Sequence, residues 1–413
     1  MAKILIIGGG AAGMAASVFL AQRGHQVHLF EKNEKLGKKL FITGKGRCNV
    51  TNDCDPETFF ASVVSNPKFM YSAYYGCTSQ DMMDFFETLG VHLKTERGNR
   101  VFPVSDHSSD VIRGLERKMQ ELDVKIHLRI TVKDVLIRED RAYGILLDNE
   151  SIIEGDRVIV ATGGVSYPST GSTGDGYEFA RKAGHKIVDV HPALVPLVTK
   201  EEYITKMQGL SLKNVRFVIR EGKKVLYDEF GEMLFTHFGI SGPLVLTASS
   251  VIAKKLQKKE LTAYIDVKAA LTEQQLDARI LREFDAARNK QFKNALSGMF
   301  PSKMEPVILE LSGIPLDKKV NEITKEERHR LIRCIKEFPV TITGVREFKE
   351  AIITQGGVKT GEIQPGTMES KKTEHLYFIG EVLDLDAVTG GFNLQIAWST
   401  AFAAAEGICE EEL

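Results

Sequence analysis

The chain has 413 residues, of which 43% are hydrophobic and 26% are charged, a composition typical of a globular protein with two or three domains. Its 54 basic and 55 acidic residues give a formal net charge of −1, which argues against a global attraction to nucleic acid or to an anionic membrane. We therefore expect a small-molecule substrate, no nucleic acid and no membrane. Five cysteines without a Cys-x-x-Cys pair indicate neither a disulfide framework, nor a metal site, nor a redox disulfide.

The N-terminal segment predicts a βαβ unit that binds a dinucleotide. A buried strand at 4–7 runs into the turn Gly8-Gly9-Gly10-Ala11-Ala12-Gly13, a helix follows, and a second strand ends on Glu31. In such a turn Gly8 permits the tight bend, Gly10 lets a pyrophosphate approach the backbone, and Gly13 allows close packing of the helix. The N-terminus of the helix then faces the phosphates.

Glu31 indicates which dinucleotide fits. It ends the strand that follows the glycine turn and helix, where a carboxylate accepts hydrogen bonds from both ribose hydroxyls and repels a 2′-phosphate. FAD or NAD is therefore favoured over NADP. The uncharged stretch 4–21 also resembles a signal peptide or a membrane span, but its glycines and the strand that follows favour a soluble, cytoplasmic protein.

A long loop is predicted at 32–52. It is basic and rich in glycine and in side-chain donors, which suits contact with a diphosphate, although a solvated charged loop is the alternative. The residues that we expect to contact the cofactor here are Lys32, Lys39, Gly44, Gly46, Arg47, Cys48, Asn49 and Thr51.

Periodicity then predicts short helices, followed by short strands. The helices are expected at 57–65, 79–89 and 108–122, with a strand at 101–103. The later strands are expected at 125–129, 131–138, 141–148 and 151–154, as one returning strand and a small antiparallel meander. Val132, at the start of the meander, is a further candidate for cofactor contact.

An apolar strand at 157–160 ends in Ala161-Thr162-Gly163-Gly164, a pattern that returns the chain beside the cofactor. The segment 171–177 then opens a helix over 178–183. Asp175 is suitably placed as the N-cap of this helix, and we weigh that structural role equally with a cofactor role.

From about residue 191 the alternation of strands and helices is lost. Strand patterns at 194–199, 213–220, 223–230 and 261–267, with helical patterns at 272–289 and 324–336, predict a β-rich insert that contains a helical part. Lys254, Lys255, Lys258 and Lys259 are interpreted as a solvated helix face rather than a nucleic-acid patch.

The chain is expected to return to the first domain near residue 340. A strand is predicted at 348–353, and a buried strand at 375–379 ends on Gly380 and Glu381. Gly391, Phe392 and Asn393 then open a helix that continues to about residue 410, and its N-terminus is a second place that favours an anion.

Eight motifs occur in one order along nearly the whole chain: GGGAAG, GKGRCNVTN, ATGG, GSTGDGY, THFGISGP, TQGGV, TMESK and GEVLDLDAVTGGFNLQIA. This order resembles the YhiN/BaiN-like bacterial flavoproteins, within the glutathione-reductase superclass. The resemblance implies an α/β fold, in which an FAD-binding, Rossmann-like three-layer domain is interrupted by a β-barrel-like insert with a small helical subdomain. We place the FAD-binding domain at 1–190 and 341–413, the insert at 191–270 and 337–340, and the helical subdomain at 271–336.

The resemblance further implies an FAD-dependent oxidoreductase that moves a hydride between flavin N5 and a small organic substrate, such as an enone reduced with NAD(P)H. No second GxGxxG motif is present, so NAD(P)H would bind only transiently as electron donor. An amine or amino-ketone oxidase that uses dioxygen is one alternative. A flavin-bearing component that modifies or binds RNA is an alternative of another class.

Within this hypothesis four segments have assigned roles in binding FAD. Glu31 binds the adenosine ribose, Gly8 to Gly13 the pyrophosphate, Gly380 and Glu381 the ribityl side, and Gly391 to Asn393 the pyrimidine edge of the flavin.

The catalytic candidates lie at the predicted crossings between insert and FAD domain. His237, in the THFGISGP motif before an apolar helix, is expected as a proton donor or a carbonyl binder. Arg346 is expected to orient an anionic or carbonyl substrate. A buried structural histidine and a domain-interface ion pair are the respective alternatives.

Overall fold

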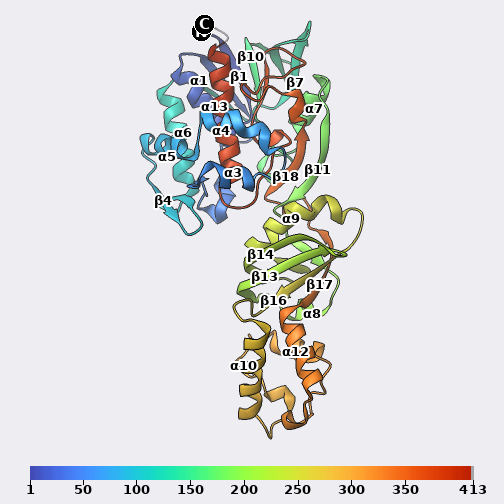
Figure 1. Cartoon of the computed structure of the whole chain (residues 1–413). Coiled ribbons are helices and arrows are strands. Elements are labelled where there is room, and N and C mark those ends of the chain that lie inside the picture. The colour runs from blue at the N-terminus through green and yellow to red at the C-terminus, as the bar shows by residue number, and fades with distance from the viewer. Residues whose placement is uncertain (411–413) are drawn as a thin grey trace. The chain divides into compact units, whose positions relative to one another are not determined.

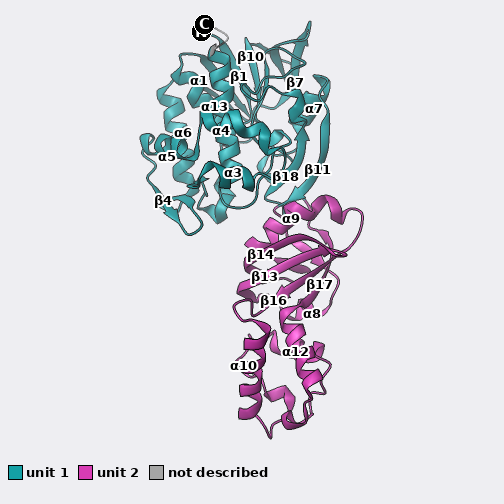
Figure 2. Ribbon diagram, viewed as in Figure 1, with its two compact units in different colours: residues 1–193, 348–413 teal, residues 194–347 magenta. Residues whose placement is uncertain are grey.

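The computed structural model describes residues 1–410, and the chain divides into two compact units (Figure 2). Unit 1 comprises Met1–Ala193 and Phe348–Leu413, and unit 2 is the single stretch Leu194–Glu347. Unit 2 contains both the strands and the helices of the predicted insert. The finer division of the insert into a β-rich part and a helical subdomain stays a prediction.

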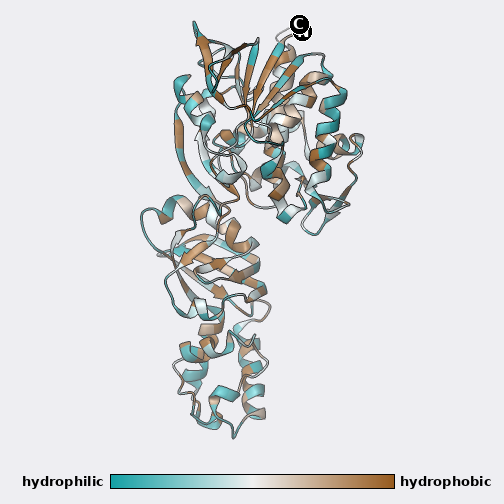
Figure 3. Ribbon diagram, turned by 180° about the vertical axis from the view of Figure 1, so that it is seen from behind, coloured by the Kyte–Doolittle hydropathy of each residue, from teal (hydrophilic) through white to brown (hydrophobic). Residues whose placement is uncertain are grey.

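Unit 1 is built on a five-stranded parallel sheet with the order β19-β10-β1-β2-β6 (Figure 1). The strands are β1 (Lys3–Ile7), β2 (Gln26–Glu31), β6 (Lys125–Leu128), β10 (Arg157–Val160) and β19 (Leu376–Phe378). The central strands are apolar along most of their length, as the brown ribbons in Figure 3 show, because both faces of the sheet are covered.

The two faces of the sheet are covered differently. On one side α1 (Ala11–Gln22) packs against α13 (Phe392–Glu410) and α6 (Ser108–Glu121). The antiparallel meander of β7 (Val132–Arg138), β8 (Arg141–Leu147) and β9 (Ile152–Glu154) contacts the sheet through β8 and β10. These layers confirm the predicted Rossmann-like fold class.

Smaller elements complete unit 1. The helices are α2 (Lys38–Ile42), α3 (Pro56–Ser62), α4 (Met70–Gly76), α5 (Ser79–Thr88) and α7 (Asp175–Lys182). The strands are β3 (Thr51–Asn52), β4 (Leu93–Glu96), β5 (Arg100–Pro103), β11 (Ile187–Ala193) and β18 (Ile353–Val358), and 3₁₀ turns lie at Thr43–Gly46, Pro67–Phe69, Pro168–Thr170, Thr360–Glu362 and Gly380–Val382. The predicted loop at 32–52 thus contains a short helix, and α4 was not predicted.

The predicted strand at 348–353 is wrong. A turn lies there instead, closed by a hydrogen bond from Ala351 N to Phe348 O (3.3 Å), and the strand is β18, which pairs antiparallel with β11. Gly356 and Gly357 lie inside β18 at φ values of +95° and +136°. A Cβ at Gly356 would contact the carbonyl oxygen of Asp189, so glycine here permits close approach of the two strands.

Asp175 is not the N-cap of its helix. Gly174 occupies that position with φ +86°, and Asp175 is the first helical residue, where its carboxylate instead bonds to Thr173 Oγ1 (2.9 Å) and Lys32 Nζ (2.6 Å). The left-handed conformation at position 174 favours glycine and moves the start of the helix by one residue.

Unit 2 contains a closed six-stranded barrel in the order β12-β15-β14-β13-β16-β17, which confirms the predicted β-barrel. Its strands are β12 (Leu197–Thr199), β13 (Ser211–Glu221), β14 (Lys224–Phe235), β15 (Gly239–Ser241), β16 (Leu261–Asp266) and β17 (Phe338–Val345). The helices of unit 2 are α8 (Tyr203–Lys206), α9 (Pro243–Leu256), α10 (Glu273–Ala286), α11 (Glu305–Leu311) and α12 (Lys325–Lys336), with 3₁₀ turns at Phe292–Asn294 and Val320–Glu322. Over residues 1–410 no helix is both long and apolar enough to cross a membrane.

Candidate cofactor site

In the glycine turn after β1, neighbouring protein atoms leave no room for a side chain at Gly8, Gly9 or Gly13, but they leave room for one at Gly10. Gly8 has φ +108°, and a Cβ there would lie 2.5 Å from the carbonyl oxygen of Ala161. A Cβ at Gly13 would overlap the carbonyl oxygen of Gly8, whereas a Cβ at Gly10 would meet no protein atom within 4 Å. Gly8 and Gly13 are therefore required by the fold, and the space at Gly10 is open to a ligand, beside Ala11 and Ala12 at the start of α1.

Glu31 is buried and held firmly at the end of β2. Its Oε2 accepts from Gly9 N (2.7 Å), and its Oε1 accepts from the backbone nitrogen (2.8 Å) and the side-chain amide (2.6 Å) of Asn33. A carboxylate has about four acceptor positions, so roughly one remains for a ligand hydroxyl. Asn33, which the sequence analysis did not single out, thus fixes the orientation of the predicted ribose-binding group.

A polar network centred on Glu381 joins four segments of unit 1. Lys39 Nζ contacts both carboxylate oxygens of Glu381 (2.9 and 2.6 Å) and Ser166 Oγ (2.6 Å). Ser166 Oγ (2.9 Å) and Thr354 N (2.8 Å) also donate to Glu381 Oε1. The predicted residues Lys39 and Glu381 are therefore direct partners. Ser166 and Thr354 were not named as site residues, although Thr354 is the first residue of the TQGGV motif and Ser166 follows ATGG by two residues.

Arg47 and Cys48, also in the 32–52 segment, lie in different environments. Arg47 donates to Glu96 and Asp106 and stacks over the ring of Phe102 (4.1 Å), so its guanidinium serves the local fold. Cys48 is fully buried, and burial raises the pKa of its thiol to about 12, so it is protonated at neutral pH.

Three other members of this segment, Gly44, Gly46 and Asn49, lie in or shortly after the 3₁₀ turn Thr43–Gly46. Gly44 and Gly46 have φ values of +62° and +84°, and Asn49 Oδ1 is buried with no partner among the described residues. An unpartnered buried amide oxygen suits a ligand that donates a hydrogen bond.

The end of β10 lies against the glycine turn. Ala161 N donates to Ile7 O (2.8 Å), and Thr162 Oγ1 is buried without a partner in the described part of the chain. Gly163 has φ +72°, and a Cβ there would lie 3.9 Å from Glu381 Oε2. Val132 is buried at the start of β7, close in sequence to Ile130, whose backbone nitrogen donates to Glu31 O (3.1 Å).

The C-terminal motifs return to the same place. Gly380 has φ +71°, and a Cβ there would lie 2.9 Å from the Cβ of Ala12. Gly391 has φ +102°, and a Cβ there would overlap the carbonyl oxygen of Thr51.

The start of α13 is fixed by its own side chains. Asn393, one residue after Phe392, bonds to Ala387 N (2.9 Å) and Ala387 O (2.8 Å), and Thr51 Oγ1 donates to Gln395 Oε1 (2.6 Å). The loop before the helix is therefore held to the helix it precedes.

The glycine turn, Glu31, Thr162 and Glu381 lie at or just after the carboxyl ends of β1, β2, β10 and β19, the edge at which open α/β sheets bind ligands. The open position at Gly10, the remaining acceptor on Glu31 and the unpartnered oxygens of Asn49 and Thr162 fit a large polar cofactor such as FAD. Contact of each residue with the cofactor stays a prediction.

The two catalytic candidates lie in unit 2 and share one aromatic neighbour. His237 is exposed, and its ring lies edge-on to that of Phe238 at 4.9 Å; the guanidinium of Arg346 lies 4.5 Å from the same Phe238 ring. The alternative of a buried structural histidine is therefore wrong. The pairing of His237 with Arg346 through Phe238 was not foreseen, because the two residues are far apart in the sequence.

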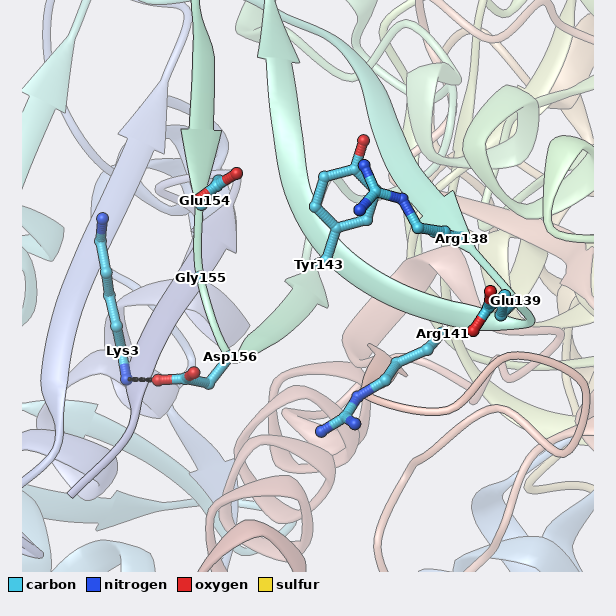
Figure 4. Close-up of a pocket in the computed structure, with 8 residues that line it drawn as sticks. All are labelled: Lys3, Arg138, Glu139, Arg141, Tyr143, Glu154, Gly155 and Asp156. Atoms are coloured by element: carbon cyan, nitrogen blue, oxygen red, sulfur yellow. Dashed lines mark hydrogen bonds between the residues drawn. The ribbon is translucent and has the colours of Figure 1, made fainter.

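A cavity of about 580 Å³ lies elsewhere in unit 1 (Figure 4). Its lining residues are Lys3, Arg138, Glu139, Arg141, Tyr143, Glu154, Gly155 and Asp156. Lys3 and Asp156 are at the amino ends of β1 and β10, at the opposite ends of these strands from Gly8 and Ala161. This cavity is therefore not the predicted cofactor site.

A parallel sheet with this glycine turn, completed by C-terminal glycine motifs and interrupted by a barrel, defines a flavin-dependent oxidoreductase that binds FAD. Residues 2–407 match the family described as HI0933-like protein Rossmann domain, and the chain belongs to this family.

Two relatives match over nearly their whole length. The chain is 34% identical over 413 residues to a 3-dehydro-bile acid delta(4,6)-reductase from Clostridium scindens, covering 99% of this chain and 100% of the relative. It is 31% identical over 407 residues to a ribosomal RNA dihydrouridine synthase from Escherichia coli, covering 98% and 97%.

Solved structures support the fold. A 3-ketosteroid delta1-dehydrogenase from Sterolibacterium denitrificans aligns with a TM-score of 0.53 and 13% identity, over 99% of each chain. A 3-ketosteroid-delta4-(5alpha)-dehydrogenase from Rhodococcus jostii aligns with a TM-score of 0.52 and 14% identity, over 98% of this chain and 96% of that one. At these identities the likeness concerns the fold alone.

Proposed function

We propose that this protein reduces a carbon–carbon double bond conjugated to a carbonyl group. The observation that supports it is the chemistry shared by the two relatives' names. A 3-dehydro-bile acid with double bonds at positions 4 and 6 is a conjugated ketone, and uridine becomes dihydrouridine by reduction of the C5=C6 bond conjugated to its C4 carbonyl. Relatives with different substrates thus share one reaction type.

FAD, once bound and reduced by NAD(P)H, would supply the hydride for the β-carbon of the double bond, and the proton for the α-carbon would come from a side chain of this protein. The backbone nitrogens between Gly8 and Gly13 would bind the pyrophosphate at the start of α1, and Glu31 would accept from the ribose. Glu381, in an orientation fixed by Lys39, would bind the ribityl hydroxyls.

The N-terminus of α13 lies at the pyrimidine edge of the flavin in this proposal. A helix terminus contributes about 1 kcal/mol to the stability of a nearby negative charge. For a two-electron couple this corresponds to roughly 20 mV of reduction potential. The helix would therefore tune the potential without setting it.

His237 is proposed as the proton donor, and Arg346 as the group that orients the substrate carbonyl. Both assignments rest on the sequence motifs and on the shared contact with Phe238. NAD(P)H is proposed as the electron donor that binds transiently, and a cytoplasmic location would give access to it.

The test is anaerobic reduction of the bound flavin with NADH and NADPH, followed by reoxidation with a conjugated enone, fumarate, a quinone or dioxygen. We expect the enone to reoxidise the flavin fastest and to be recovered with its double bond saturated. Turnover of amines with dioxygen, and none with enones, would instead support the amine-oxidase alternative. A purified protein that carries no flavin and binds none on reconstitution would contradict the whole account.

A further inference from the structure

The near-zero net charge of the chain conceals a separation of charge between its two units. Unit 2 has 26 Lys and Arg residues against 20 Asp and Glu residues, a formal charge of +6. Unit 1 has 28 against 35, a formal charge of −7. The net charge of the whole chain is therefore not sufficient to exclude nucleic acid as a ligand of unit 2.

The excess in unit 2 lies at one end of the barrel, where β13 ends, β14 begins, α9 ends and β16 begins. We call this region the lysine-rich end. Its basic residues are Lys200, Arg220, Lys223, Lys224, Lys254, Lys255, Lys258 and Lys259, and its acids are Glu201, Glu221 and Glu260. These eleven residues have a formal charge of +5, and the rest of unit 2 is nearly balanced at 18 against 17.

Contacts hold the segments of the lysine-rich end together. Glu221, at the end of β13, accepts from Lys259 (2.6 Å) and Lys255 (3.1 Å), and these two lysines lower the pKa of Glu221 to about 2. Lys200 pairs with Glu260 (3.2 Å), which lies directly before β16. The lysines of the β13–β14 turn and those after α9 therefore form one surface.

Four lysines of this surface are available to a ligand. Lys223, Lys224, Lys254 and Lys258 are exposed and form no ion pair with any carboxylate in residues 1–410. Lysines in the last turn of a helix commonly stabilise its negative end, which accounts for Lys254. That role does not account for the other three, which lie outside α9.

We propose that the lysine-rich end binds the phosphate backbone of RNA. Several unpaired lysines on one surface match a line of phosphates, because each neutralised phosphate releases a counterion. The negative charge of unit 1 disfavours binding there, so a polyanion is directed to unit 2. The relatives named as ribosomal RNA dihydrouridine synthases are consistent with RNA as the partner. The inference that this surface docks the substrate rests on the proposed function, because the RNA would then carry the uracil ring whose conjugated double bond is reduced.

The test measures binding of a fluorescein-labelled 20-nucleotide oligouridine to the full-length, FAD-loaded protein by anisotropy, at several KCl concentrations. One variant combines Lys223→Gln, Lys224→Gln, Lys254→Gln and Lys258→Gln. The matched control combines Lys213→Gln, Lys290→Gln, Lys293→Gln and Lys325→Gln, four exposed lysines elsewhere in unit 2 with the same total charge change.

We expect the first variant to bind about 10-fold or more weakly at 0.1 M salt. Its plot of log affinity against log salt should be less steep by roughly 3, since each lost contact with single-stranded RNA removes about 0.7. The control should bind within about twofold of the unaltered protein, and reduction of the flavin by NAD(P)H should be unchanged in both.

Equal weakening in both variants, or no binding by the unaltered protein, would overturn the inference. So would equally tight binding of a polyglutamate peptide or of anionic phosphatidylserine vesicles through the same four lysines. Flavin reduction is a separate readout, so failure of RNA binding is distinguishable from failure of the proposed reductase function.

Discussion

Gly10 offers a sharp test of where the cofactor binds. Its backbone has φ −84° and ψ −168°, a conformation open to any residue, and a Cβ there would meet no protein atom within 4 Å. Gly10→Ala should therefore change the stability of the apoprotein by less than about 1 kcal/mol, the range of N-cap effects.

The same methyl group should obstruct a pyrophosphate that approaches the backbone. Loss of one charge-assisted hydrogen bond costs about 1.5–3 kcal/mol. That corresponds to a FAD dissociation constant about 10- to 100-fold higher. Titration of apoprotein with FAD, followed by flavin fluorescence, measures this constant, and thermal unfolding of the apoprotein measures stability.

Gly13→Ala is the matched comparison. Its Cβ would overlap the carbonyl oxygen of Gly8, so the apoprotein itself should be destabilised before any cofactor is added. An unchanged FAD dissociation constant in Gly10→Ala would refute the placement of the pyrophosphate at this turn. A strongly destabilised Gly10→Ala apoprotein would refute the finding that the turn is open at this residue.

Three further predictions concern Lys39, the neighbouring histidines His28 and His127, and His237. Lys39→Met removes the partner of Glu381, whose side chain is 22% exposed, and should lower the free energy of unfolding by about 2 kcal/mol in a urea titration. His28 and His127 both have a pKa below the ordinary value of 6.5. Burial lowers the pKa of each, and the nearby His127 lowers that of His28 further. The unfolded chain then binds more protons below pH 6.5, so the free energy of unfolding should fall as pH decreases from about 7 to about 5, and less so in His127→Phe. His237→Ala should lower turnover by about 100-fold or more at unchanged flavin content if His237 donates the proton.

Each of these has a control or an outcome that would contradict it. Lys38→Met breaks an ion pair whose acid, Glu34, is 48% exposed, and should cost under about 1 kcal/mol. An equal loss in both lysine variants would contradict the stabilising role of the partly buried Glu381 network. For the histidine pair, an equal fall with pH in His127→Phe and in the unaltered protein would contradict the assignment to His28 and His127. Unchanged turnover in His237→Ala would remove this residue from the reaction.

The successful predictions were those that depend on residues close together in the sequence. The glycine turn, α1 and Glu31 lie in one short N-terminal segment, so periodicity and spacing were sufficient to predict their arrangement. The partners of Glu381 were beyond such reasoning, because Lys39 is far away in the sequence and only the folded sheet brings the two together. Likewise, no local pattern distinguishes an arginine that contacts a cofactor from Arg47, which bonds to Glu96 and Asp106.

The clearest error was the strand predicted at 348–353. The strand is β18, which begins only at Ile353 and continues through Gly356 and Gly357, where neighbouring backbone leaves no room for a side chain. Close approach of segments distant in sequence is a tertiary property. The exposure of His237 is another such property, since a histidine that precedes a phenylalanine is equally compatible with burial.

The way the chain passes through its two units has a consequence for its synthesis. Unit 2 is one continuous stretch, so it can fold as soon as Glu347 has left the ribosome. Unit 1 cannot: β18, β19 and α13 are translated after the whole of unit 2, and until then the sheet lacks an outer strand and α1 lacks the helix that covers it. The segment Met1–Ala193 therefore exposes apolar surface while the insert is being made, which makes this intermediate a natural client for chaperones and a sensitive stage for truncation.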